Sequence, residues 1–494
     1  MAVGAHTDLR GTGAVEDMFV GGTIIAGLRD AHIHAVPYAA LLRGCSLKSA
    51  KTMEELQNRI VAHARRLPAG SPVVATRFDD ETLVERRLPT RTDLDAAISD
   101  RPVVIYRYCG HIAVANSKAL TESGISDATS NPEGGIIDRD ASAQPTGVLR
   151  ETAVGLITGA LARGGHLEPD DLLDSLTRLA GLGLTSIGAM IGYGESPSEK
   201  LAAEAELWRE VAKNLPIKVR GFAIADTPNQ LDHAAQTISG ITERLSWLGV
   251  KRFSDGSLGG HTAAMCGGFS DVGTTGTYRL TPADANVARH SLALGGMVAI
   301  HAIGDRAVTG VLDLFEELIA EGADPADLRM EHASVIDPDQ IRRFAGLGVT
   351  AAVQPAFLAS ESEWIGQRVG IDRLGWVYPF RSLLEAGVPL AGSSDSPVEP
   401  PHPLWGMAAA MDRYGITPAE RLSGTEALDL FTSGGAAALR ESEPLSVGSP
   451  ADLVVLDVDP TTASADEVHS ASVLETYVDG EPVEVDRSLP TWVD

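Results

Sequence analysis

The sequence is poor in basic residues, and this limits what the protein can bind. It has 40 lysines and arginines against 67 aspartates and glutamates, which gives a formal net charge of −27. Such a chain repels phosphate backbones and anionic membrane surfaces. We therefore expect neither nucleic acid nor a membrane among its partners.

Cysteine is also scarce. The three cysteines, Cys45, Cys109 and Cys266, are far apart in the sequence and odd in number. They lack the paired spacing of a zinc knuckle or a disulfide framework. This usage is typical of a reducing compartment, and we expect a cytoplasmic protein.

Long apolar runs are absent as well. Residues 1–20 mix Asp, Arg, His and Glu with Gly, and so have neither the basic start nor the apolar stretch of a signal peptide. The longest weakly polar stretch, 180–194, is Gly-rich and falls short of the roughly 20 apolar residues that a membrane-spanning helix needs. We expect no transmembrane segment.

The chain does have length. Its 494 residues, 44% of them hydrophobic, are too many for one ordinary core and suit a large barrel with an added domain. From residue 181 onward, short apolar runs alternate with helical patterns, as in the repeated β/α units of a parallel barrel. Candidate strands are 23–35, 184–190, 217–224, 250–255, 297–303, 329–334, 349–355 and 389–396.

The spacing of these strands predicts an insertion. Roughly 150 residues separate the first two strands, whereas a simple βα unit needs about 30. The middle of this segment, 131–152, is rich in Gly, Pro and Asp, which indicates hairpins. After helices over about 400–440, the segments 449–459 and 472–485 look like strands joined by an Asp-Gly turn.

The predicted fold class is therefore α/β, a (β/α)8 TIM barrel with a large insertion between strands 1 and 2 and a small β appendage near the termini. The expected parts are an N-terminal segment of the appendage (1–22), the first barrel strand (23–35), the inserted domain (36–180), the remainder of the barrel (181–440) and the C-terminal β appendage (441–494).

Histidines and an aspartate mark the ends of several strands. His32 and His34 are two residues apart, so a strand would place both rings on one face. Alone, such a pair more often faces solvent or is satisfied in a core. His301, His332 and Asp395, however, each end a separate predicted strand, and barrel enzymes carry their chemistry at those ends.

A lysine belongs to the same pattern. Lys251 lies on the predicted fourth strand, where entry into the barrel interior is costly unless the lysine is paired, deprotonated or covalently modified. A structural ion pair with a carboxylate such as Asp255 is the alternative to a functional role. Taken together, the six residues predict a metal site.

Several segments, in the same order along most of the chain, resemble the amidohydrolase superfamily and in particular the branch that includes N-substituted formamide deformylases. They are GLRDAHIHA (27–35), GHIAVANSKAL (110–120), QPTGVLRETA (144–153), VKRFSDGSLGGHTAAM (250–265), VAIHAIGDRAV (298–308), RMEHASVIDPDQIRRFAGLGVTAAVQP (329–355), GSSDSPVEPPHPL (392–404) and GSPADLVVLD (448–457).

The resemblance implies a barrel whose strands 1, 4, 5, 6 and 8 supply the ligands of one or two divalent ions. Zinc suits such mixed His/Asp sites. In two-metal relatives the lysine of strand 4 carries a bridging carbamate, which implies the same for Lys251. Relatives usually begin with a longer β segment, so the β appendage is expected to be reduced. The implied ligands are His32, His34, Lys251, His301, His332 and Asp395.

We expect a hydrolase that cleaves the C–N bond of an amide or formamide in a small-molecule substrate. A divalent metal would activate water, and Asp395 would accept a proton and pass it to the leaving nitrogen. A deaminase, a lactonase or a phosphotriesterase would use the same metal core. A non-catalytic barrel that serves as a binding protein is the alternative from another class. A homodimer is compatible with each of these functions.

Four further residues are candidates for supporting roles. His111 and Glu151, in the insertion, could contact substrate or merely stabilise hairpins. His261 could line the barrel mouth, although a loop histidine more often has no specific role. Asp305 could hydrogen-bond a ligand histidine and orient it, or could cap a helix.

Overall fold

The computed structural model describes residues 22–108, 112–132, 135–157, 167–192, 198–487 and 491–492. Of these, the residues before Val36 and those from Leu173 to Thr491 form one compact unit, the barrel unit. Those from Val36 to Leu172, together with Trp492, form a second compact unit, the insertion unit.

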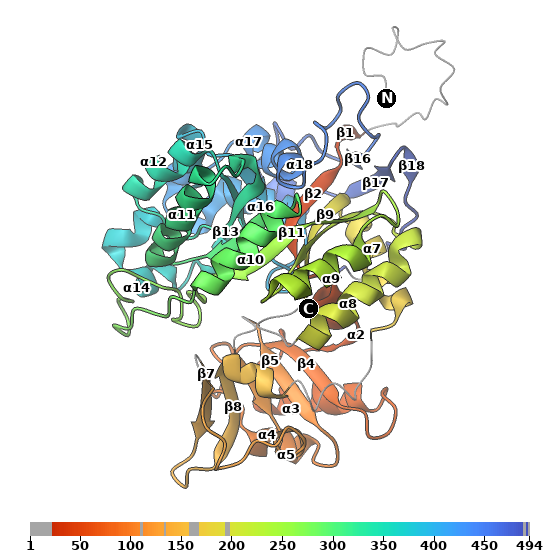
Figure 1. Cartoon of the computed structure of the whole chain (residues 1–494). Helices are drawn as coiled ribbons and strands as arrows, with labels where there is room; N and C mark the ends of the chain where they lie inside the picture. The colour runs from red at the N-terminus through yellow and green to blue at the C-terminus, as the bar shows by residue number, and fades with distance from the viewer. Residues whose placement is uncertain are drawn as a thin grey trace. The chain divides into compact units, whose positions relative to one another are not determined.

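Eight parallel strands in chain order make up the main sheet of the barrel unit, which confirms the predicted (β/α)8 fold class (Figure 1). They are β2 (Leu28–Ile33), β9 (Leu184–Ile191), β10 (Lys218–Ala223), β11 (Leu245–Phe253), β12 (Met297–Ala302), β13 (Leu328–His332), β14 (Thr350–Val353) and β15 (Leu390–Gly392).

The last strand meets the first just beyond the end of β15. The amide of His34 donates to the carbonyl of Ser396 at 2.8 Å, and the amide of Asp395 donates to the carbonyl of His32 at 2.8 Å. These two hydrogen bonds bring the segment after β15 alongside the end of β2. The barrel is thereby nearly closed, and its closing seam lies where His32, His34 and Asp395 are placed.

Helices surround this sheet (Figure 1). Their ends carry strong capping signals. In α12, for example, Asp337 and Gln340 form a capping box, and Gly348 ends the helix with φ 70°. The principal helices are α8 (Ser198–Val211), α9 (Pro228–Ile238), α10 (Pro282–Ala293), α11 (Asp305–Ala320), α12 (Pro338–Leu347), α15 (Phe380–Glu385), α16 (Pro403–Asp412), α17 (Gly424–Phe431) and α18 (Ser433–Ala438).

The insertion unit contains a mixed sheet in the order β3-β4-β5-β6-β8-β7. The hairpin predicted within 131–152 is present as β7 and β8, which pair antiparallel. The first three strands pair parallel, and α3 (Met53–Ala64) and α4 (Arg91–Ala97) connect them. The strands are β3 (Cys45–Ser46), β4 (Val73–Phe78), β5 (Val103–Arg107), β6 (Ile112–Ala115), β7 (Gly135–Arg139) and β8 (Pro145–Glu151).

A small antiparallel sheet contains β1 (Thr23–Ala26), β16 (Leu453–Leu456), β17 (Val473–Val478) and β18 (Glu481–Pro482). The β appendage was expected to be reduced near the N-terminus. The N-terminal strand β1 nevertheless pairs with β16 of the C-terminal segment. Asp479 and Gly480 have φ of 56° and 85° and form an Asp-Gly turn, but this turn lies within 472–485 and joins β17 to β18. The prediction that it joins 449–459 to 472–485 was wrong, because that connection contains α19 (Ala465–Ser470).

The segment 23–35 is therefore two strands rather than the single barrel strand predicted. The break is at Gly27, whose amide donates to the Asp452 carbonyl, whereas the next amide, of Leu28, donates to Gly183. A methyl group at Gly27 would lie 2.3 Å from Thr185 Oγ1. The chain thus passes from one sheet to the other at a position with no room for a side chain.

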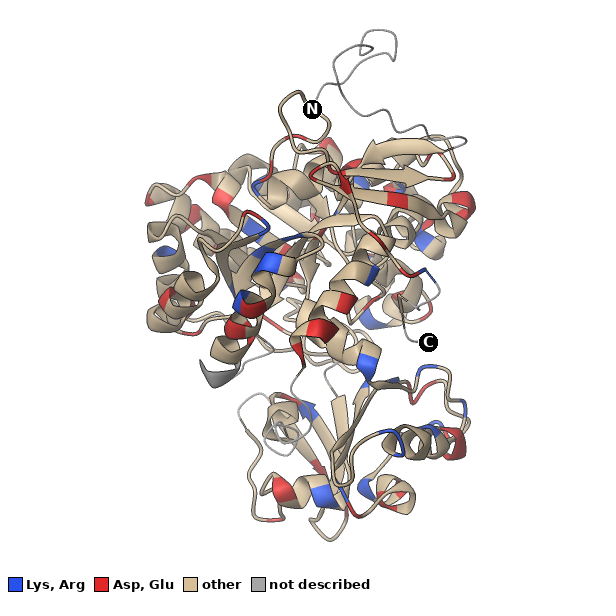
Figure 2. Ribbon diagram, turned by 90° about the vertical axis from the view of Figure 1, so that its right-hand side faces the viewer, with Lys and Arg blue, Asp and Glu red and all other residues tan. Residues whose placement is uncertain are grey.

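The charged residues lie interspersed along helices and loops (Figure 2). Many of them pair with opposite charges on neighbouring helices, as Arg343 of α12 does with Glu316 of α11 at 2.6 Å. In the described part of the chain, every helix is too short or too polar to cross a lipid bilayer.

Candidate functional site

Two histidines and an aspartate meet at the closing seam of the barrel. The distance from Asp395 Oδ1 is 3.3 Å to His32 Nε2 and 3.4 Å to His34 Nε2. One ligand atom from each residue lies within 4.8 Å of the other two. Although burial opposes ionisation, the His32, His34 and His332 rings hold the pKa of the Asp395 carboxyl well below its usual range. The group is a carboxylate and a candidate metal ligand.

The other two predicted histidines adjoin this trio. The ring centroid of His332 lies 5.1 Å from that of His32 and 4.4 Å from that of His301. His332 ends β13 with φ 71°, a left-handed conformation that departs from the extended strand before it. The four imidazoles therefore form one continuous group at the ends of the barrel strands.

Two of these rings are held in the neutral form. Burial, with the nearby Lys251 ammonium, lowers the pKa of His32 to about 4. Burial, with the charge of His301, lowers the pKa of His332 well below its usual value. Neutral imidazole is the form that binds a metal, so no proton has to be removed from either ring near neutral pH.

Lys251 lies on β11 and is fully buried. Its Nζ atom has no hydrogen-bond partner among the described residues and lies 4.9 Å from the centre of the Phe253 ring. Burial lowers the pKa of Lys251 to about 8. The alternative ion pair with Asp255 is not formed within the described ranges. The amides of Ala264, Ile303 and Gly304 donate to the Asp255 carboxylate instead.

A buried ion pair fixes the orientation of His32. Glu331 Oε2 lies 2.6 Å from His32 Nδ1, and its other oxygen accepts from Arg329 Nε at 2.5 Å. Burial raises the pKa of Glu331, but Arg329 and His32 outweigh burial and hold this pKa at about 2. With Nδ1 held by this carboxylate, Nε2 of His32 faces Asp395 and can bind a metal.

Sequence reasoning missed Glu331, although a signal for it existed. Arg329 and Glu331 are two residues apart on a fully buried strand, so both side chains face the same side. Gln354 was also missed; its Oε1 lies 2.8 Å from His332 Nδ1. Gln354 lies directly beyond β14 and orients His332 in the way that Glu331 orients His32.

Asp305 lies at the start of α11, and its role in orienting a ligand histidine stays a prediction. Its carboxylate accepts from the amides of Cys266 and Arg306 at the start of α11, and Gly304 is the cap residue of that helix. Among the described residues, the carboxylate beside His301 is Asp255, at 3.3 Å from His301 Nε2. Asp255 approaches His301 from the end of the neighbouring strand β11, whereas Asp305 lies at the start of α11, near the position of the capping alternative.

The three residues predicted to contact substrate lie in different parts of the chain. His261 lies in the loop after β11, and its Nε2 is 2.9 Å from Asp271 Oδ2. Glu151 ends β8 in the insertion unit with φ 52°. His111 lies outside the described residues. Contact of these three residues with substrate remains a prediction.

A buried carboxyl that the sequence did not reveal lies in the segment after β14. Glu361, at the end of α13 (Phe357–Glu361), accepts a hydrogen bond from the Tyr378 hydroxyl at 2.7 Å. Burial raises the pKa of Glu361 to about 8, and the charge of Glu399 adds to this while Arg368 opposes it. Glu361 is therefore mostly protonated at neutral pH.

The comparisons with known proteins identify the family of this chain. Residues 20–484 match the sequence pattern of the Amidohydrolase family, and the chain belongs to that family. It is 30% identical to the N-substituted formamide deformylase of Arthrobacter pascens, over 97% of this chain and 92% of that protein. It is also 30% identical to the protein LONG AFTER FAR-RED 3 of Arabidopsis thaliana, over 97% of this chain and 86% of that protein.

A solved structure is similar over most of the chain. That of an uncharacterized metal-dependent hydrolase from Pyrococcus furiosus is 33% identical and superposes with a TM-score of 0.70, over 90% of this chain and 88% of that one. The family resemblance inferred from the sequence is confirmed.

We predict that Glu331→Gln weakens both the fold and the metal site. The substitution leaves the fully buried Arg329 without its counter-charge, which should destabilise the protein by about 3–5 kcal/mol. Loss of the carboxylate behind His32 should lower metal affinity roughly 10–100-fold. Denaturant unfolding and competition with a chelator measure the two effects. Glu316→Gln, in an exposed ion pair on α11, is the control, and equal metal affinity in both variants would contradict the assignment.

We also predict that Glu361→Gln makes stability less dependent on pH. Folding raises the pKa of Glu361 from 4.5 to about 8, so the folded state binds more protons, and wild-type stability falls as pH rises through this window. The amide cannot ionise and still accepts from Tyr378. The variant should therefore gain stability relative to wild type between about pH 5 and pH 8, as denaturant unfolding will show. Glu363→Gln, exposed in the same segment, should show no such gain.

Proposed function

We propose that this protein is a metal-dependent hydrolase that cleaves a C–N bond of an amide or formamide in a small molecule. The observation that carries the proposal is the convergence of His32, His34 and Asp395 on one point, with a neutral imidazole at His32 beside an ionised carboxylate. The name of the Arthrobacter pascens relative supports a formamide as the substrate.

The donor set fits one or two divalent ions, of which zinc is the best suited to mixed imidazole and carboxylate ligands. His32, His34 and Asp395 would hold the first ion. His301 and His332, whose rings adjoin, would hold a second. A bound divalent ion supplies a Lewis acid that polarises the scissile carbonyl and makes water more acidic.

Lys251 would complete a two-metal site as a carbamate. Its fully buried nitrogen lacks a hydrogen-bond partner among the described residues, so no neighbour there blocks its reaction. The neutral amine attacks carbon dioxide, a C–N bond forms, and the nitrogen releases a proton. The product is an anion with two oxygen ligands in place of a cation, which suits a site that binds positive ions.

Asp395 would move the proton during hydrolysis. Its carboxylate is ionised, so it can accept a proton from the attacking water and deliver it to the leaving nitrogen. Glu331 and Gln354 keep the His32 and His332 rings in place during these steps. A deaminase, a lactonase and a phosphotriesterase would use the same groups, so activity against a panel of formamides, amides, lactones and phosphotriesters decides among them.

We predict that Asp395→Asn leaves a folded protein with roughly 10²–10⁴-fold lower turnover, because asparagine keeps the size but cannot accept a proton. His111→Ala and Glu151→Ala serve as comparisons and should raise KM more than they lower kcat, since these residues are proposed to place substrate. Steady-state kinetics and elemental analysis are the measurements. Near-normal turnover in Asp395→Asn with its metal bound, or active wild type with less than about a tenth of an equivalent of metal, would refute the proposal.

We predict that metal-loaded protein exposed to ¹³C-labelled bicarbonate shows a carbamate resonance that Lys251→Met lacks. In metal-free protein near neutral pH, Lys251→Met should be more stable than wild type. Folding lowers the pKa of the lysine from 10.5 to about 8, so the folded state disfavours its charged form, and methionine removes that penalty. A metal-loaded crystal structure with an unmodified Lys251 ammonium would leave only a one-metal site.

A further inference from the structure

A polar cavity lies at the end of the barrel opposite the candidate metal site. It is open to solvent on one side and has a volume of about 300 Å³. Residues near the starts of β2, β10 and β11 and residues between Leu439 and Asp452 line it. Because the strands are parallel, their starts lie at the face away from His32 and Asp395. Nothing in the hydrolase proposal uses this cavity.

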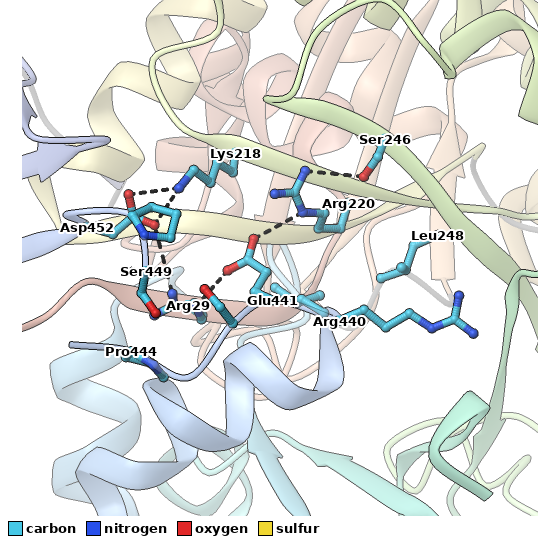
Figure 3. Close-up of a pocket in the computed structure, with 13 residues that line it drawn as sticks. Arg29, Lys218, Arg220, Ser246, Leu248, Arg440, Glu441, Pro444, Ser449 and Asp452 are labelled. Carbon is cyan, nitrogen blue, oxygen red and sulfur yellow. Dashed lines mark hydrogen bonds and ion pairs between the residues drawn. The ribbon is translucent and has the colours of Figure 1, made fainter. Parts of the chain in front are cut away.

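Four of its 13 lining residues are arginine or lysine, in a chain whose formal net charge is −27. Arg29, Lys218 and Arg220 lie around Glu441 and Asp452, as Figure 3 shows. Arg29 and Lys218 are only 3% and 6% exposed. Three largely buried cations and two carboxylates thus line one cavity, and a third carboxylate, Asp479, lies 2.8 Å from Lys218.

The two carboxylates do not use all of the cationic donors. Glu441 accepts from Arg29 Nε at 2.8 Å and from Arg220 Nε at 3.0 Å. Asp452 accepts from Lys218 at 2.7 Å, but it lies 3.9 Å from Arg29 Nη2, which is too far for a hydrogen bond. Arg29 Nη2 therefore has no acceptor among the described residues.

Arg220 has an unused donor as well. Its Nε bonds Glu441, and its Nη1 bonds the carbonyl of Glu243 and the hydroxyl of Ser246. Within the described ranges, Arg220 Nη2 has no hydrogen-bond partner. Two strands, β2 and β10, thus each present one guanidinium nitrogen without an acceptor at the same cavity, beside the ammonium of Lys218.

We propose that this cavity binds a small oxyanion, a phosphate or a carboxylate group, held by Arg29, Lys218 and Arg220. Guanidinium groups bind such oxygens through charge-assisted hydrogen bonds, and among the described residues each of the two arginines has one nitrogen free to make one. The anion would supply acceptors to both arginines.

Binding of the anion would stabilise the contact between the barrel and the small terminal sheet. The lining segment leads from α18 to β16, so it connects the barrel to the small terminal sheet. Lys218 also pairs with Asp479, in the turn between β17 and β18, at 2.8 Å. An anion held between β2, β10 and this segment would fix the terminal sheet to the barrel and raise the unfolding temperature.

The test is titration calorimetry of the metal-loaded protein with phosphate and, separately, with acetate, at constant ionic strength set by sodium chloride. Saturable binding is expected, and a matching rise in unfolding temperature. Arg220→Gln should weaken it roughly tenfold or more, as expected for loss of one charge-assisted hydrogen bond. Arg220→Lys keeps the charge beside Glu441, so it protects the fold while removing Nη2, and it should also bind more weakly than wild type.

Two controls separate this cavity from other sites. Arg343→Gln, an exposed arginine of α12, should bind as wild type does. His34→Ala, which removes a candidate metal ligand, should retain anion binding, so the result does not depend on the hydrolase proposal. Tighter binding of phosphate identifies a phosphate group as the ligand, and tighter binding of acetate identifies a carboxylate. Absence of saturable binding, equal binding in both Arg220 variants and wild type, or loss of binding in His34→Ala would overturn the proposal.

Discussion

The hydrogen bond from the Asp395 amide to the His32 carbonyl is the contact on which the candidate site depends. It joins the segment after the last barrel strand to the first strand, and in doing so it places the Asp395 carboxylate 3.3 Å from the His32 ring. Closure of the barrel and assembly of the site are therefore one event. A barrel opened at this seam would separate His32 of the first strand, and His34 just beyond it, from the Asp395 carboxylate.

Charge balance inside the barrel is the second constraint. Arg329, Glu331 and Lys251 are all fully buried. Arg329 and Glu331 neutralise each other, and the pair holds His32 in place, whereas Lys251 has no hydrogen-bond partner among the described residues. Ionised groups in a protein interior are stable only when paired or coordinated. Arg329 and Glu331 are stabilised by each other, whereas no such partner among the described residues stabilises Lys251. This lack of a partner supports the proposal that Lys251 has a chemical role.

Much of this arrangement follows from the sequence. Strand order and the positions of His32, His34, His301, His332 and Asp395 at strand ends could be predicted because a parallel β/α pattern repeats regularly along the chain. The predicted fold class is confirmed. Its error at 23–35 came from a single residue, Gly27, because nothing local shows that the chain changes sheets where Thr185 leaves no space for a side chain.

Short-range periodicity in the sequence is enough to predict which elements form and which of their ends carry metal-binding side chains. The partners that orient those side chains became visible in the folded chain. Glu331 lies 299 residues from His32 in the sequence and 2.6 Å from its ring, and Asp255 rather than Asp305 lies beside His301. Hydrogen bonds of this kind depend on the register between neighbouring strands and on the closure of the barrel, and these are set by packing of the whole sheet.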